Sequence, residues 1–227
     1  MTNREKIKLR PTLEQIYFAR AIQAVEEAKQ QSTAAAEHDH LFWLWRMVDE
    51  MHDLGDEVDP DEDPTIAAGR LALGLGHAFG LFLQSLILSH VFCAMTLEAH
   101  VNNTASRHLP GSLRDAFDRL PLRDKWLFLP RLLSRDGFEP GAEPFQGFTT
   151  LVTLRNRLVH AKGEDLVFLL RRGADSRALL DDGITDAENS LQVVHSMVHA
   201  LAGLLGSPVP SWLEHAESTP YLLEYGA

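Results

Sequence analysis

The segment LALGLGHAFGLFLQSLILSHVFCAMTL, residues 71–97, contains no Asp, Glu, Lys or Arg. An uncharged run of this length fits either a membrane-spanning helix or the central helix of a folded core. Five polar side chains interrupt the run, namely His77, Gln84, Ser85, Ser89 and His90. Because its flanks also lack the basic cluster typical of membrane helices, we expect a buried central helix and no membrane contact.

Further helices are predicted before and after this run. Apolar residues recur at helical spacing over Pro11–Gln31, with Thr12 as a candidate N-cap. A second helix is expected over residues 37–55, between Asp39 as a candidate N-cap and Gly55 as a stop. The remaining predicted helices cover residues 113–120, 122–133, 149–162 and 187–206, the last with Asp186 as its cap.

The order of these elements predicts an all-α fold class. DLVFLL, residues 165–170, is the one stretch that could form a short strand, and the sequence shows no internal repeat. VDPDEDP, residues 58–64, has the composition of a loop and marks the edge of the main core. We therefore expect an N-terminal helical extension over residues 1–63 and a helical bundle with a C-terminal tail over residues 64–227.

The formal net charge of −11 argues against indiscriminate nucleic-acid binding, because phosphate-directed affinity is built from Lys and Arg. The charge is unevenly distributed along the chain. Residues 107–177 hold 13 Lys and Arg against 9 Asp and Glu, whereas the remainder holds 8 against 23. One locally basic segment thus belongs to an acidic chain, either as one charged face or as scattered solvated arginines.

Cys93 is the single cysteine, so no disulfide can form within the chain. The N-terminus has early basic residues but no continuous apolar stretch followed by a small-residue cleavage site. Both features lead us to expect a cytoplasmic protein.

Two patterns suggest metal sites but fit other roles better. The carboxylates from Asp59 to Asp63 alternate like calcium ligands, yet Pro64 occupies the position that requires glycine. His195 and His199 lie four residues apart on a predicted helix, without the glutamate or the third ligand of a zinc motif. We therefore expect no bound metal and no cofactor.

The segment LRNRLVHAKG, residues 154–163, is the one plausible chemical centre. Arg155 offers a planar fork of donors that matches phosphoryl oxygens, and His160 lies where the helix macrodipole favours the imidazolium form. The spacing alone decides nothing, because 16 Arg and 11 His would give about 0.8 such pairs by chance. The prediction depends on placement near a helix end inside the basic segment, with Asn156 and His160 at i and i+4.

The geometry of a helix limits how these side chains can cooperate. Five residues rotate by about 500°, which leaves Arg155 and His160 roughly 140° apart around the axis. Either the arginine side chain wraps back, or two copies of the helix meet across a two-fold axis and share their residues. The second arrangement predicts an obligate homodimer.

These residues resemble the HEPN superfamily of helical domains, many of which are RNA-cleaving toxins or antiviral effectors. The family motif is Arg, usually followed by Asn or another polar residue, three to five further positions and His, and RNRLVH at residues 155–160 matches it. TLEAHVNN, residues 96–103, is similar to the end of the family's first core helix, with Glu98 and Asn102 as its acidic residue and Asn. The resemblance covers about residues 70–206 and implies a HEPN-like antiparallel helical bundle.

The resemblance implies a metal-independent endoribonuclease, a toxin or phage-defence effector, in which the 2′-hydroxyl of RNA attacks the adjacent phosphate. His160 would act as general acid or base, Arg155 would stabilise charge on the phosphorane, and Asn156 would position the phosphate or His160. Four more residues are expected to bind substrate or to support these three, namely Glu98, Asn102, Arg157 and Lys162. The expected partners are a second copy of the chain, an RNA substrate and an antitoxin protein.

An alternative hypothesis is that the protein is not an enzyme but a non-catalytic HEPN-like module that dimerises and binds a protein or nucleotide partner. In that case Arg155 is paired with Glu164 or another carboxylate as a structural ion pair. The enzyme needs Arg155 and His160 accessible in a basic cleft, whereas the binding module tolerates them buried and paired.

Overall fold

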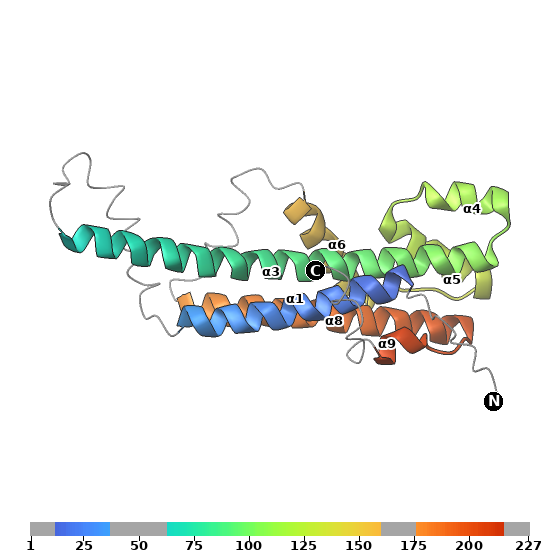
Figure 1. Ribbon diagram of the computed structural model, residues 1–227. Coiled ribbons are helices and arrows are strands. Elements are labelled where there is room, and N and C mark those ends of the chain that lie inside the picture. The colour runs from blue at the N-terminus through green and yellow to red at the C-terminus, as the bar shows by residue number, and fades with distance from the viewer. Residues whose placement is uncertain (1–11, 37–62, 160–175, 216–227) are drawn as a thin grey trace, which may run out of the picture. The chain divides into compact units, whose positions relative to one another are not determined.

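The computed structural model describes residues 12–36, 63–159 and 176–215 (Figure 1). This described part is mostly helical and contains no β-strand, which confirms the all-α prediction. Its helices are α1 (Leu13–Ala36), α3 (Asp63–His108), α4 (Gly111–Asp118), α5 (Leu122–Ser134), α6 (Phe145–Val159), α8 (Ser176–Leu205) and α9 (Ser211–His215). The helix predicted over residues 37–55 and the short strand predicted over residues 165–170 lie outside the described residues.

The chain forms two compact units, each made of segments that are distant in sequence. Unit 1 comprises residues 1–20, 92–149 and 193–227, and unit 2 comprises residues 21–91 and 150–192. Helices α1, α3, α6 and α8 contribute residues to both units. The division into an N-terminal extension and a helical bundle at residue 63 stays a prediction.

The uncharged run forms one continuous helix with the residues that follow it, the 46-residue α3. In unit 1 this helix buries Cys93, Leu97, Val101 and Ala105, which succeed one another at four-residue intervals and so share one face. Residues 80–108 are long and apolar enough to cross a membrane, a test that the core helix of a folded protein also passes. The predicted helix is confirmed and has one buried face, whereas the expected lack of membrane contact stays a prediction.

Trp126 on α5 lies at the centre of an aromatic cluster in unit 1. Its ring centroid is 5.7 Å from that of Phe148, 5.8 Å from that of Phe138 and 6.2 Å from that of His100. Phe145 extends the cluster, with its ring 5.4 Å from Phe148. Trp126 is fully buried, and its indole Nε1 has no hydrogen-bond partner in the described part of the chain. Tilted and edge-on aromatic contacts therefore join α3, α5 and α6 within this unit.

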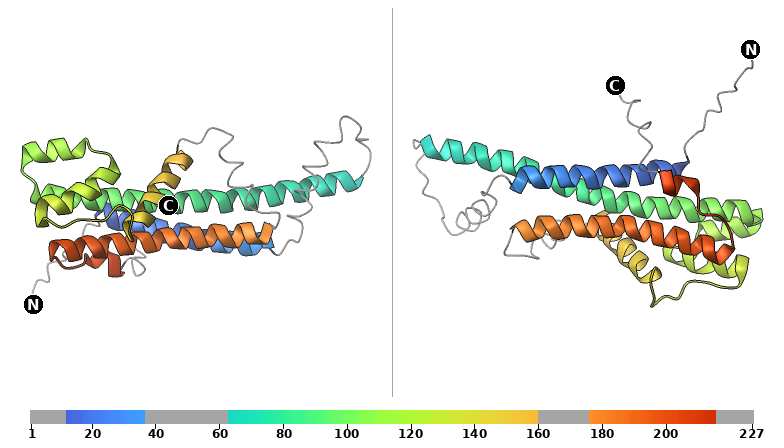
Figure 2. Two further views of the ribbon diagram at one scale, coloured as in Figure 1. Left: turned by 180° about the vertical axis from the view of Figure 1, so that it is seen from behind. Right: turned by 90° about the horizontal axis from the view of Figure 1, so that it is seen from below.

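The first turns of α1 also belong to the core of unit 1. Phe18 is fully buried and contacts Trp212 of α9, with ring centroids 5.8 Å apart. His195 of α8 lies edge-on to the same phenyl ring at 5.2 Å. Figure 2 shows the short α9 beside this end of α1. Thr12 caps the helix as predicted, since the Gln15 N–H donates to its hydroxyl oxygen over 3.4 Å.

The last long helix begins earlier than its predicted N-cap at Asp186, because α8 starts at Ser176. Gly183 lies inside this helix, and a Cβ atom there would be 2.7 Å from Cδ1 of Leu86 and 3.3 Å from Cζ of Phe82. The glycine thus allows α8 to approach α3 closely within unit 2. The N-cap prediction is wrong, because Asp186 lies inside α8 and not before its first residue.

Helix α6 likewise begins earlier than predicted, at Phe145 instead of Thr149. The Pro144 carbonyl accepts a hydrogen bond from the Phe148 N–H over 3.2 Å, so the proline starts the helix instead of interrupting it. The Gly147 N–H donates to Oε2 of Glu143, also over 3.2 Å, which satisfies a donor in the first turn. The Pro- and Gly-rich loop predicted over residues 138–148 is therefore shorter than expected.

Candidate functional site

Helix α6 carries Arg155, Asn156 and Arg157 near its C-terminal end. Phe148 and Leu151 are buried, and Arg155 continues their stripe after a further four residues. Arg155 is half-buried, whereas Asn156 and Arg157 are exposed. The helix therefore turns the stem of Arg155 toward its apolar face and leaves the two neighbouring side chains in solvent.

The guanidinium of Arg155 is held by its neighbour in sequence. Its Nη1 donates a hydrogen bond to Oδ1 of Asn156 over 3.1 Å. Among the described residues, no carboxylate lies within 4.0 Å of this guanidinium. Because a guanidinium has five N–H donors, this single contact orients the group and leaves donors for an anionic ligand.

Two residues of the predicted site, His160 and Lys162, lie outside the described residues, and so does Glu164, the ion-pair partner of Arg155 in the alternative function. The described part of α6 ends at Val159. The relationship between Arg155 and His160, and the alternative ion pair of Arg155 with Glu164, therefore stay predictions.

Asn102, predicted to support the site, binds a buried lysine on another helix of unit 1. Its Oδ1 accepts a hydrogen bond from Nζ of Lys125 on α5 over 3.0 Å. The same ammonium group lies 5.9 Å from the centre of the Phe117 ring on α4. Glu98 is half-buried and lies one helical turn before Asn102 on α3. The structure thus brings Asn102 together with Lys125 in unit 1, and Arg155 together with Asn156 in unit 2.

Lys125 is the polar residue near the predicted site that sequence reasoning missed. It has only 5% of its surface exposed, although lysine is almost never buried without a partner. The available signal was its helix position, because Lys125 lies next to Trp126 and four residues before Leu129, both fully buried. Its place on the apolar face of α5 indicated a buried amine.

His100 is a second buried polar residue in unit 1. Burial lowers the pKa of its imidazole from 6.5 to about 4, while the Glu14 carboxyl raises this pKa and Arg107 lowers it further. Glu14 is itself buried and accepts a hydrogen bond from Nδ2 of Asn103 over 2.6 Å. His100 is therefore neutral near pH 7 and belongs to the aromatic core.

His90 and Ser190 form a buried polar pair in unit 2. Burial lowers the pKa of His90 from 6.5 to about 4. The Ser190 hydroxyl lies 3.1 Å from the Asp186 carbonyl oxygen, to which it donates, and 2.8 Å from Nδ1 of His90. Because the hydroxyl proton is used in the first bond, the neutral His90 donates from Nδ1 in the second. The pair holds α3 against α8 and does not have the geometry of an activated nucleophile.

No group of three or more His, Cys, Asp or Glu residues is arranged to hold a metal ion within the described ranges. His195 packs against Phe18, and His199 is exposed on α8. These positions suit ordinary helix histidines. Asp59, Asp61 and Glu62 lie outside the described residues, whereas Asp63 begins α3, and the expectation of no metal and no cofactor stays a prediction.

Comparisons with protein-family models, with curated proteins and with solved structures found no match to this chain. The resemblance to the HEPN superfamily therefore depends on RNRLVH at residues 155–160 and on TLEAHVNN at residues 96–103.

Proposed function

We propose that the protein is a metal-independent endoribonuclease of the HEPN type that acts as a homodimer. The observation that carries this proposal is the state of Arg155. Arg155 as a residue is half-buried, and its guanidinium donates an exposed hydrogen bond to Asn156 and has no carboxylate within 4.0 Å in the described part of the chain. An arginine in this state can offer its donors to a phosphate instead of neutralising a neighbouring carboxylate.

The proposed reaction is an internal transesterification of RNA. The 2′-oxygen of one ribose forms a bond to the adjacent phosphorus, and the bond from phosphorus to the 5′-oxygen of the next nucleotide breaks. The 2′-hydroxyl proton passes to a base and the leaving oxygen takes up a proton, with His160 as one of these two groups. Arg155 donates to the non-bridging oxygens as charge develops on the phosphorane, and Asn156 keeps the guanidinium in position. The products are a 2′,3′-cyclic phosphate and a 5′-hydroxyl.

The biological role that we propose follows from the family resemblance. An RNA-cleaving toxin or phage-defence effector acts on RNA in the cytoplasm, so we place the protein there. Such an activity would be harmful without control, and we propose an antitoxin protein as the partner that neutralises it.

The test is RNA cleavage in the presence of EDTA, with the products identified by their end groups. Wild-type protein is expected to cleave, Arg155→Ala to lose about 10²–10³-fold of the rate, and His160→Ala to lose about 10²–10⁴-fold. His199→Ala is the matched control, because His199 is an exposed histidine on α8, and this variant should cleave like wild type. Circular dichroism establishes that each variant is folded.

Unchanged cleavage by either the Arg155 or the His160 variant would overturn the mechanism. Absence of cleavage by all preparations would favour the non-catalytic binding module. One contact is in line with that second function, because the hydrogen bond from Lys125 gives Asn102 a structural role. Sedimentation of the purified protein with and without a nucleotide would then test for a dimer that binds ligand.

A further inference from the structure

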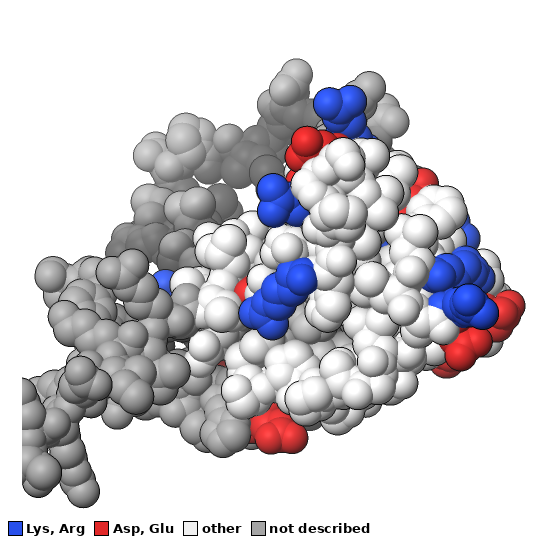
Figure 3. Space-filling model, turned by 90° about the vertical axis from the view of Figure 1, so that its right-hand side faces the viewer, with Lys and Arg blue, Asp and Glu red and all other residues white. Residues whose placement is uncertain are grey.

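Unit 1 carries a group of arginines at the end of α3, on α4 and on α5. Residues 107–135 contain seven Lys and Arg against three Asp and Glu, in a chain whose net charge is −11. Figure 3 views the structure from the side of these helices and shows Lys and Arg side chains at several places, with Asp and Glu side chains beside some of them and uncharged surface between others. Most arginine side chains of residues 107–135 are therefore exposed to solvent.

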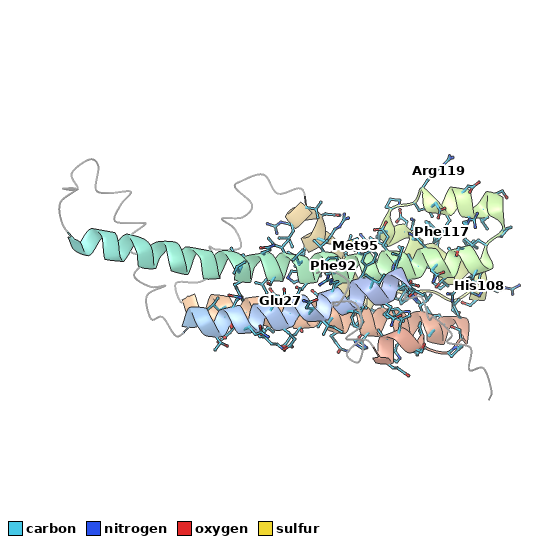
Figure 4. The ribbon with its side chains drawn as sticks, viewed as in Figure 1. Glu27, Phe92, Met95, His108, Phe117 and Arg119 are labelled. Atoms are coloured by element: carbon cyan, nitrogen blue, oxygen red, sulfur yellow. The ribbon has the colours of Figure 1, made fainter. Side chains whose placement is uncertain are left out.

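Two arginines, Arg114 on α4 and Arg119 at its C-cap, do not pair with the carboxylates next to them. Arg114 has Asp118 four residues ahead, and Arg119 has Asp115 four residues behind, which is the spacing of helical ion pairs. Both arginines are exposed, yet no carboxylate of the described residues lies within 4.0 Å of either guanidinium. In Figure 4, Phe117 points from α4 toward the interior and Arg119 points away from it. The N–H donors of these two arginines are thus available to an external anion.

Helix α5 continues this surface with an exposed aromatic ring. Phe128 has 47% of its surface exposed, and Arg135 follows the last residue of α5 as its C-cap, with φ of +71°. Arg135 is exposed and has no carboxylate within 4.0 Å in the described ranges. Arg123, which is also exposed, lies over the ring of Phe145 with 5.8 Å between its Cζ and the ring centre.

One arginine of α5 does not belong to this surface. The Nη2 of Arg131 donates to the carbonyl oxygen of Phe138 over 3.0 Å, and Nη1 donates to the carbonyl oxygen of Leu127 over 3.4 Å. Gly137 leaves room for this side chain, since a Cβ atom there would be 2.7 Å from Cγ of Arg131. Arg131 therefore holds the loop after α5, and its substitution would report on folding.

We propose that Arg114, Arg119, Arg123, Arg135 and Phe128 form a binding surface for single-stranded RNA. Arginine donors match the phosphates of the backbone, and an exposed aromatic ring gives an unpaired base a face on which to stack. A nucleic acid duplex offers the phosphates but keeps its bases stacked inside, so Phe128 favours a single strand. The choice of RNA rests on the proposed function.

The experiment measures binding of a fluorescently labelled 2′-O-methyl RNA of mixed sequence by anisotropy, at several salt concentrations. This RNA lacks the 2′-hydroxyl that the proposed reaction requires, so binding is separated from cleavage. For Arg114→Ala combined with Arg119→Ala, the slope of log affinity against log salt should fall by about 1.4, at about 0.7 for each lost phosphate contact. Phe128→Leu should weaken binding at least about five-fold, whereas Phe128→Tyr should bind like wild type.

The matched control is Gln30→Glu combined with Gln84→Glu, two exposed glutamines of unit 2. This variant changes the net charge by the same two units, and it should keep the wild-type salt slope. The proposal is overturned if the arginine variant binds like this control, or if an RNA duplex of the same length binds as tightly as the single strand.

The outcomes also separate this surface from the proposed function. Arg155→Ala is expected to bind the 2′-O-methyl RNA even though it no longer cleaves. Binding that depends on Phe128 and the arginines in a protein that does not cleave RNA would support the surface and contradict the nuclease. Cleavage that requires Arg155, together with RNA binding that is unchanged in the Arg114, Arg119 and Phe128 variants, would support the nuclease and contradict the binding surface.

Discussion

The side-chain oxygen of Asn102 on α3 accepts a hydrogen bond from the ammonium group of Lys125 on α5, over 3.0 Å. Lys125 is buried, and its ammonium nitrogen also lies 5.9 Å from the centre of the Phe117 ring. No carboxylate of the described residues lies within 4.0 Å of it. A buried ammonium loses its hydration, so an amide oxygen and an aromatic face are the groups that offset this loss.

Asn102→Ala should lower the free energy of unfolding by about 1–3 kcal/mol, because it removes a hydrogen bond from a buried charged donor. The same substitution should cost less in a Lys125→Met background, where the charged donor is absent. Urea unfolding of the two single variants and the double variant gives this coupling. Asn189→Ala, at an exposed position of α8, is the matched control and should stay within about 0.5 kcal/mol of wild type. Equal costs of Asn102→Ala in both backgrounds would contradict the prediction.

The protein should lose stability on mild acidification because of His90 and His100. Burial lowers the pKa of each to about 4, from 6.5, so the unfolded chain binds more protons than the folded protein between these two pH values. Stability should therefore be constant above about pH 6.5 and fall as the pH approaches 4, by up to about 3 kcal/mol for each histidine. Urea unfolding between pH 7.5 and 4.5 measures the loss.

His100→Gln should reduce this acid sensitivity, since the variant has one fewer buried group to protonate. His108→Gln changes an exposed histidine on the same helix and should keep the wild-type pH profile. If both variants lost stability with pH in the same way as wild type, His100 would not be a source of the effect.

Gly206→Ala should destabilise the protein by about 1 kcal/mol through backbone conformation alone. Gly206 follows α8 with φ of +60°, and the Ser207 N–H donates to the Ala202 carbonyl oxygen over 2.9 Å, which is a Schellman helix end. A Cβ atom at Gly206 would meet nothing within 4 Å, so no steric contact adds to the cost. Gly203→Ala, at an equally open position inside the helix, should not destabilise, and thermal unfolding of the two variants compares them. Equal stability of the two variants would contradict this account.

If two chains share one site, two inactive variants should restore activity to each other. In a mixture of Arg155→Ala and His160→Ala chains, each mixed dimer would hold one site with both native residues. About half of the dimers would be mixed and half of their sites intact, so cleavage should return to about a quarter of the wild-type rate. The two variants are unfolded together, refolded and assayed. No recovery, despite mixed dimers shown by differential tagging, would place Arg155 and His160 of each site on one chain.

Sequence patterns predicted the helices better than their boundaries. The uncharged run ending at Leu97 predicted α3 because length and composition alone exclude a strand there. The start of α8 was missed because Asp186 has the residue type of an N-cap, whereas the structure places it inside the helix. Pro144 read as part of a loop, although the residue before a helix is where proline fits well. Boundaries depend on contacts between elements, which local sequence does not contain.

The sequence allowed us to predict which residues belong to the candidate site, but not which hydrogen bonds Arg155 and Asn102 make. The half-buried position of Arg155 follows from the apolar stripe of α6. Its bond to Asn156 joins consecutive residues, a pairing that helical spacing rules do not anticipate. The bond between Asn102 and Lys125 joins residues on two helices, so only the packed structure could reveal it.

Cys93 lies on the buried face of α3, and burial raises the pKa of its thiol. It is also the single cysteine of the chain. An alkylating reagent can therefore react only with molecules in which this part of α3 has separated from the core of unit 1. The rate at which Cys93 is alkylated therefore measures how often this part of α3 opens in the native protein, without any substitution in the chain.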